Sequence, residues 1–336
     1  MRELLLIVVL GLALTHFACA AEGTAAGQAG VTAGPMGKIP VIFETDIGDD
    51  IDDTWALLML LRTPKADLKL VTTTYGKQEY RGKLLARLLT AAGRTDVPIG
   101  LGAGDQKGTG GQQDFVKDYD LGSYAGKVHK DGVQALIDTI HASRQPITVI
   151  AVGPLNTLGA AVQRDPSIAA KAHLVGMHGS VRKGYDGKDR VDAEWNVKQA
   201  VKQAQAVFSA PWKSVTITPL DTCGLIRLDG ERFARLRASQ DKLTAVLMDN
   251  YRMWARKQRL DELKASSVLF DTAAVYLALY DRSLANLEEL RIAVDDKGFT
   301  RVDPAGKSML VATSWKDLGA YQDLLTKVIE GQREPK

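Results

Sequence analysis

Apolar and polar positions alternate along the chain with two different periods from about Lys38 onward. Short apolar runs rich in β-branched residues predict buried strands at 39–45, 68–74, 97–102 and 146–152. Between these runs, apolar residues recur at helical spacing and predict helices near 52–62, 79–92 and 132–142. Strands that alternate with helices are typical of a parallel sheet with crossover helices on its faces. We therefore expect an α/β fold.

One domain accounts for most of the chain. No Pro- or Ser-rich linker divides residues 38–331, and we find no internal repeat, so we expect a single mostly parallel open sheet flanked by helices. In such sheets ligands bind at the carboxyl ends of the strands. The Gly-rich segment 102–113 follows a predicted strand, and it is either a mobile rim of such a site or a plain surface excursion.

The amino terminus has the pattern of an export signal. Residues 1–20 contain Arg2, an apolar run from Leu4 to Leu14 and the small residues of an Ala18-Cys19-Ala20 cleavage site. Residues 21–37 are small and mostly uncharged, which is the composition of a flexible linker. We expect a secreted or periplasmic protein. Lipid anchoring at Cys19 is less favoured because the residues before it make a poor lipobox.

Composition and charge exclude several classes of protein. The 43 basic and 40 acidic residues give a net charge of +3 with no basic stripe, so we expect no nucleic-acid partner. No segment after the signal has the eighteen or so consecutive apolar residues that would predict a membrane span. Cys223 is the one cysteine left after signal removal, which excludes an intramolecular disulfide.

Candidate chemistry concentrates where the first predicted strand ends. Six acids occur among the ten residues 44–53 (ETDIGDDIDD), directly before an apolar helix. Like charges this close destabilise one another unless they are solvated, protonated or neutralised by a bound cation. A solvated turn with Asp52 or Asp53 capping the helix explains one or two of these acids. A site for a hard cation such as Ca²⁺ or Mg²⁺ explains several.

This stretch resembles the signature of the inosine-uridine-preferring nucleoside hydrolase family, D-x-D-P-G-x-D-D-x-x-A. Asp46 and Gly48 match directly, whereas Asp52, Asp53 and Ala56 match if two residues are inserted after Gly48. Asp50 is then an additional acid. Further stretches resemble the family in the same order, at 71–76, 97–103, 147–168, 192–196 and 270–275.

The resemblance implies a calcium-dependent hydrolase that cleaves the N-glycosidic bond of a ribonucleoside or related riboside to free base and ribose. It implies that Asp46 is both the catalytic base and a metal ligand. The other expected ligands are Asp50, Asp53, Asp271 and the carbonyl of Val152, although the choice among Asp49, Asp50 and Asp52 stays open. Contacts to the substrate are expected from Glu194, Asn196 and Trp195. The family also makes a homo-oligomer an expectation.

Two positions depart from the family pattern. Lys77 stands where the family has a ribose-binding Asn, and it is either a surface lysine or a contact for an anionic or strongly polar substrate group. Phe270 stands where several members have the His that protonates the leaving group, and phenylalanine cannot donate a proton. His178, Tyr185 and Tyr251 are the alternative acids, although each such residue is more often structural.

A different kind of protein is also compatible with these departures. An exported binding protein for a nucleoside or pentose-containing ligand could keep the metal site while lacking catalysis. A phosphatase of the haloacid-dehalogenase type is disfavoured, since the first carboxylate there must be a nucleophilic Asp and this chain has Glu44. Replacement of Asp46 by Asn distinguishes the hydrolase from the binding protein, because it abolishes turnover in an enzyme and leaves part of the ligand affinity in a binder.

Overall fold

The computed structural model describes residues 37–108, 110–256 and 260–332. The expected signal peptide, residues 1–20, and nearly all of the expected linker, 21–37, lie outside these residues. Contacts group Gly37–Lys336 into one compact unit. None of the helices in the described part of the chain has the length and apolar character needed to cross a bilayer.

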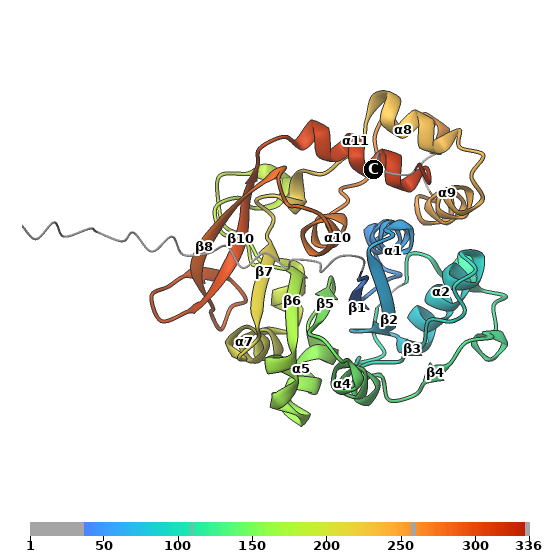
Figure 1. Ribbon diagram of the computed structural model, residues 1–336. Coiled ribbons are helices and arrows are strands. Elements are labelled where there is room, and N and C mark those ends of the chain that lie inside the picture. Colours follow the sequence, from blue (N-terminus) through green and yellow to red (C-terminus); the bar gives the residue numbers. More distant parts are fainter. Residues whose placement is uncertain (1–36, 109, 257–259, 333–336) are drawn as a thin grey trace, which may run out of the picture. The chain divides into compact units, whose positions relative to one another are not determined.

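The described chain folds into one ten-stranded sheet with helices on both faces (Figure 1). The strands are β1 (Ile39–Thr45), β2 (Ala66–Thr73), β3 (Ile99–Gly100), β4 (Val128–His129), β5 (Ile147–Ala151), β6 (Ala172–Met177), β7 (Ser214–Thr218), β8 (Ala285–Val294), β9 (Thr300–Val302) and β10 (Lys307–Trp315). The α-helices are α1 (Asp52–Arg62), α2 (Gln78–Ala91), α3 (Gln113–Val116), α4 (Gly132–Ala142), α5 (Asn156–Arg164), α6 (Trp195–Gln199), α7 (Val201–Ser209), α8 (Gly230–Arg237), α9 (Lys242–Trp254), α10 (Thr272–Leu279) and α11 (Leu318–Ile329).

The order of the strands places the amino-terminal strand near the centre of the sheet. It runs β4-β3-β2-β1-β5-β6-β7-β10-β8-β9, and every pair from β4 to β10 is parallel. Only the last two pairs, β10 with β8 and β8 with β9, are antiparallel. The chain winds away from β1 in one direction through β2 and in the other through β5. This reversal opens a crevice at the carboxyl ends of β1 and β5.

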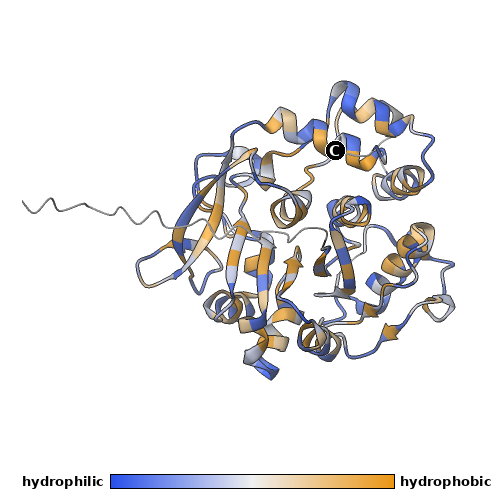
Figure 2. Cartoon of the chain, viewed as in Figure 1, coloured by the Kyte–Doolittle hydropathy of each residue, from blue (hydrophilic) through white to orange (hydrophobic). Residues whose placement is uncertain are grey.

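Both faces of the sheet are buried. In β1, Val41 and Phe43 pack into one apolar cluster with α1, α10 and α11, whereas Ile42 packs into a second cluster with α4, α5 and α7. This explains why the first strand is a continuous apolar run, since a parallel strand is covered on both sides. Hydrophobic residues gather on the strands, and hydrophilic residues on the outer turns (Figure 2).

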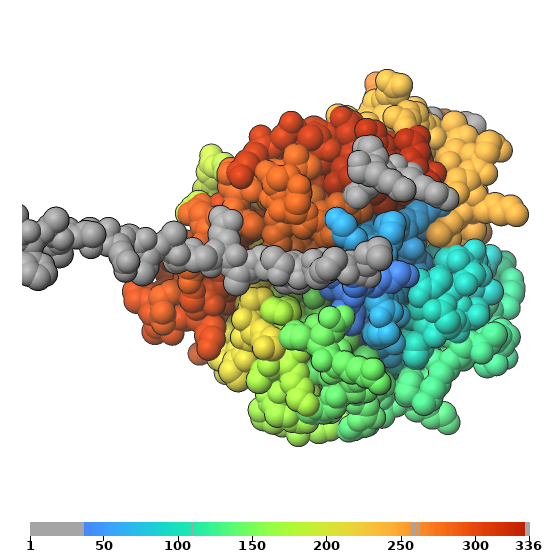
Figure 3. Space-filling view, viewed as in Figure 1, coloured from blue at the N-terminus to red at the C-terminus, as the bar shows by residue number. Residues whose placement is uncertain are grey.

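The carboxyl-terminal part of the chain packs back onto the first helix. Helix α1 contacts both α10 and α11. The space-filling view shows the orange and red segments directly beside the blue amino-terminal ones (Figure 3). The α/β fold with its mostly parallel sheet is therefore confirmed, and this packing brings the start of α10 next to the start of α1.

Candidate active site

A cavity of about 550 Å³ lies at the carboxyl ends of the central strands. It is formed by the loop after β1, the first turn of α1, the ends of β5 and β6, and the starts of α6 and α10. Gly108, in the Gly-rich segment 102–113, also lines it, so that segment contributes to the rim. The lining includes seven carboxylates: Asp46, Asp49, Asp50, Asp52, Asp53, Glu194 and Asp271.

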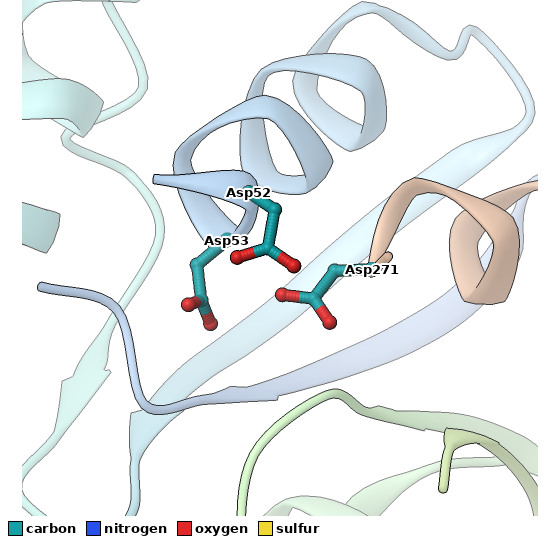
Figure 4. Close-up of side chains that lie close together, drawn as sticks. All are labelled: Asp52, Asp53 and Asp271. Carbon is teal, nitrogen blue, oxygen red and sulfur yellow. The ribbon is translucent and has the colours of Figure 1, made fainter. Parts of the chain in front are cut away.

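Three of these carboxylates form a compact trio. Asp52 and Asp53 lie in the first turn of α1, and Asp271 immediately precedes α10. One oxygen of each lies within 4.8 Å of the others, all three residues are buried, and Figure 4 shows the carboxylates pointing toward one another. Burial, followed by mutual repulsion, raises the pKa of all three well above the ordinary value. A hard cation with oxygen ligands fits this arrangement, since it neutralises charges that otherwise repel.

Asp46 lies beside the trio and is itself buried, at 8 % exposure. Burial raises its pKa to about 6, and Arg81 partly opposes this rise. The hydroxyl of the preceding residue, Thr45, donates a hydrogen bond to the Asp53 carboxylate and accepts one from the Ile47 amide at 3.1 Å. The end of β1 therefore positions Asp46 and Asp53 together.

Arg81 ties the acidic loop to the rest of the fold. Its side chain is 1 % exposed, although it carries a full charge. The guanidinium donates to the carbonyls of Asp46 and Ile47, to the Tyr75 carbonyl at 2.7 Å, and to the Asp49 carboxylate at 2.8 Å. One residue of α2 thereby joins the loops that follow β1 and β2. Nothing in the sequence pattern indicated this role, because a single arginine within a helix is usually a solvated one.

Glu194 and Asn196 lie at the start of α6. Glu194 caps that helix, accepting from the amides of Asn196 at 2.7 Å and Val197 at 3.2 Å, and it also accepts from Gly179 at 2.9 Å. Burial raises its pKa to about 7. The Asn196 amide donates to the carbonyl of Val152 at 2.9 Å. The structure therefore brings Glu194, Asn196 and Val152 to the same cavity as the acidic trio.

Aromatic side chains supply much of the remaining wall. Trp195 is 51 % exposed and lies edge-on to Tyr75, with ring centroids 6.4 Å apart. Tyr185 and Phe270 form a second edge-on pair, also with centroids 6.4 Å apart. Trp254 joins them at the cavity, where its indole N–H donates to the Asp49 carbonyl at 3.0 Å.

Two residues predicted to act at the site lie elsewhere. Lys77 lines a separate hollow of about 470 Å³ together with Lys83 and Lys117, and does not line the acidic cavity. His178 is fully buried, and its Nε2 lies 3.1 Å from the Gly153 carbonyl. Burial lowers its pKa to about 4, so the ring is neutral near pH 7. This position does not favour the role of a leaving-group acid.

The structure also shows where the remaining residues named in the sequence analysis lie. Tyr251 is buried, and its hydroxyl accepts from the Ser267 amide at 2.7 Å. Cys223 is fully buried. Asp50 is exposed at the cavity and is not part of the trio, whereas Asp52, which the sequence left open, is part of it.

Comparisons with known proteins agree with this geometry. A family model for the inosine-uridine preferring nucleoside hydrolases matches residues 41–323. The chain belongs to this family. It is thus a hydrolase of the class that acts on N-glycosyl bonds of ribonucleosides.

Individual nucleoside hydrolases are similar to the chain along most of its length. Pyrimidine-specific ribonucleoside hydrolase RihA of Citrobacter koseri is 25% identical over 230 residues, which are 63% of this chain and 69% of that protein. Uridine nucleosidase 1 of Arabidopsis thaliana is 26% identical over 64% of this chain and 67% of its own.

Solved structures show the same fold. A plant nucleoside hydrolase superimposes with a TM-score of 0.73 at 22% identity, covering 87% of this chain and 99% of that chain. A purine-preferring ribonucleoside hydrolase from Gardnerella vaginalis gives 0.70 at 21% identity, with 87% and 98% covered.

Proposed function

We propose that this nucleoside hydrolase is exported and calcium-dependent, and that it cleaves a ribonucleoside or related riboside to free base and ribose. The observation that carries the proposal is the trio Asp52, Asp53 and Asp271 with Asp46 beside it in one buried pocket. Oxygen-only ligands favour a hard cation over the transition metals. Asp46 and the carbonyl of Val152 complete the proposed set of protein ligands.

The bound cation would hold the attacking water and the sugar hydroxyls in one place. Asp46 takes the proton of that water as the new bond forms. A carboxylate whose pKa is raised to about 6 is a better base near neutral pH than an ordinary one. Glu194 and Asn196 orient the hydroxyls, so that the sugar is held for attack at its anomeric carbon. Trp195 packs against the substrate at the rim.

A second function is favoured by one specific observation. Among the described residues that line the cavity there is no histidine, lysine or arginine to protonate a departing base. An exported protein that binds a nucleoside or pentose-containing ligand through the same cation needs no such group.

Replacement of Asp46 by Asn distinguishes the two functions. For a hydrolase we expect kcat to fall by about a thousandfold, because the base is lost while the shape of the pocket is kept. Initial rates of base release measure this effect, and the equilibrium affinity for the same riboside, measured by calorimetry, should change much less. A wild-type protein that binds ribosides without releasing base would show the binding function instead.

A further inference from the structure

The charge of the cavity exceeds what one divalent cation neutralises. Seven carboxylates line it, and no cationic side chain lines it within the described residues. Arg81 does not line the cavity. It contacts the backbone of the acidic loop and forms an ion pair with Asp49. Even with a divalent cation in the trio, several negative charges remain to act on a ligand.

Asp50 carries one of these remaining negative charges, and it is exposed to solvent. It lines the cavity, it is exposed, and within the described ranges its carboxylate has no ion pair. Its backbone is nevertheless held, because the Gln112 side chain donates to the Asp50 carbonyl at 2.5 Å and Trp254 donates to the neighbouring Asp49 carbonyl. The carboxylate is therefore presented at a fixed place on the wall.

Aromatic side chains line the same cavity. Trp254 is hydrogen-bonded beside Asp50, while the pairs Trp195 with Tyr75 and Tyr185 with Phe270 form other parts of the wall. Aromatic faces attract cations, and indole rings do so most strongly. Rings beside carboxylates are thus suited to a planar group that is itself positively charged.

Proton donors are scarce at this wall. Tyr185 lines the wall, and its hydroxyl accepts the Trp195 N–H at 2.9 Å while keeping its own proton. Burial raises the pKa of that hydroxyl, which makes it a weaker acid. A neutral base must gain a proton as its bond to the sugar breaks, whereas a ring that carries a fixed positive charge need not.

We propose that the preferred substrates are ribosides whose aromatic leaving group is cationic, such as pyridinium or N-alkylated purinium ribosides. This inference rests on the proposed hydrolase function. The C1′–N bond breaks and its electron pair moves to the ring nitrogen, which neutralises the ring and lets it leave without a proton. Water forms the new bond to C1′ and gives its proton to Asp46. The negative surplus of the pocket then matches the positive charge of the ring.

The test compares nicotinamide riboside, which is cationic, with uridine, which is neutral, on the full calcium-loaded protein. The measured quantity is the ratio of their kcat/KM values. We expect wild type to prefer nicotinamide riboside and Asp50→Asn to reduce the ratio about fivefold, as expected for one partly screened charge. Asp50→Glu, which keeps the charge, should retain the wild-type ratio. Raising the salt to about 0.5 M should also lower that ratio, since Asp50 is exposed to solvent.

Asp118→Asn is the matched control. It removes one exposed carboxylate that lines neither hollow, so the net charge changes equally and the ratio should not move. A wild-type preference for uridine, or equal ratios in Asp50→Asn and wild type, would overturn the inference.

A failure of the proposed function looks different. If neither riboside is hydrolysed, equilibrium binding of the same two compounds is measured. Tighter binding of nicotinamide riboside that Asp50→Asn weakens would support the cationic ligand while rejecting hydrolysis. Equal binding of the two would overturn both.

Discussion

Asp271 completes the acidic trio, whose other two members lie more than 200 positions earlier in the sequence. It precedes α10 directly, and its carboxylate meets those of Asp52 and Asp53 at the start of α1. Within the described part of the chain, no Lys or Arg side chain forms an ion pair with these three carboxylates, and Arg81 donates instead to backbone carbonyls and to Asp49. The trio is therefore suited to a bound cation, which would let all three carboxylates ionise.

Replacing Asp271 by Asn tests that account. The change keeps the size of the side chain and removes one negative ligand, so we expect calcium affinity to fall by about a hundredfold or more. Calorimetric titration with Ca²⁺ measures it. The control is Asp118→Asn, which removes an exposed carboxylate that does not line the cavity, and this variant should bind calcium with wild-type affinity. Unchanged affinity in Asp271→Asn would place the metal elsewhere.

The residues of the site were only partly predictable from the sequence. Asp46, Asp53, Asp271, Glu194 and Asn196 were singled out through motifs tied to the end of a strand or the start of a helix. Asp52 stayed one of three alternatives with Asp49 and Asp50, because the motif allows the insertion after Gly48 to be placed differently. Lys77 and His178 were chosen by sequence position, and position does not reveal the direction of a side chain. Lys77 directly precedes α2 and lines another hollow, and His178 follows β6 and is buried in the core.

At the scale of elements, Arg81 joins two loops that both border the cavity. Its replacement by Met would remove a donor from the carbonyls of Ile47 and Tyr75. The Asp49 carboxylate would keep the Gly110 amide, at 3.2 Å, as its remaining donor among the described residues. We expect the free energy of unfolding to fall by about 3 kcal/mol, as when one partner of a buried ion pair is removed. Urea unfolding measures this loss.

The matched control is Arg94→Met, which breaks the exposed pair with Asp96. Surface pairs contribute roughly 0–1 kcal/mol, so this variant should remain close to wild type. Equal losses in the two variants would show that Arg81 has no special anchoring role.

Glu44 links β1 to α5 from within the core. Its Oε1 accepts the Leu158 amide at 2.8 Å, its Oε2 has no hydrogen-bond partner among the described residues, and burial raises its pKa to about 8. The unfolded chain releases this proton near the ordinary value of 4.5, whereas the folded protein keeps it. The stability that this group contributes is therefore complete below that value and is lost as the pH rises toward 8.

Glu44→Gln should remove this pH dependence, because the amide is neutral and can still accept from Leu158. We expect the variant to gain stability relative to wild type as the pH rises from about 5 to about 8.5, by about 1 to 3 kcal/mol. Urea unfolding in the presence of a chelator measures the difference. Exposed Glu231→Gln is the control, and the same pH trend in both variants would refute the explanation.

The elements themselves were largely predictable up to β5. The predicted helices 52–62 and 132–142 coincide with α1 and α4, because their apolar stripes are flanked by clear polar breaks. The antiparallel edge formed by β8 and β10 was not foreseen. Strand β8 carries Glu288, Glu289 and Arg291, which interrupt the apolar run expected of a buried strand. Its pairing with β10 depends on contacts between separate segments that local patterns do not encode.

At the scale of the whole molecule, the cation would join α1 to α10 and thereby hold the two ends of the described fold together. Any ligand that binds only the folded state stabilises it by mass action, by about 2.7 kcal/mol at a hundred times its Kd. We expect saturating Ca²⁺ to raise the Tm by roughly 5 °C and chelation to reverse the change. Differential scanning calorimetry measures it, and Asp271→Asn should show almost no response. An equal response to Ca²⁺ in wild type and Asp271→Asn would contradict this account.

Release of base and ribose by the purified protein tests the central claim most directly. A panel of ribonucleosides and nicotinamide riboside is incubated with the protein with added Ca²⁺ and after chelation, and reducing sugar and free base are both quantified. We predict equal amounts of the two products, dependent on calcium and lost in Asp46→Asn. No release from any riboside by a protein that retains calcium and binds ribosides would contradict the hydrolase and leave a binding protein.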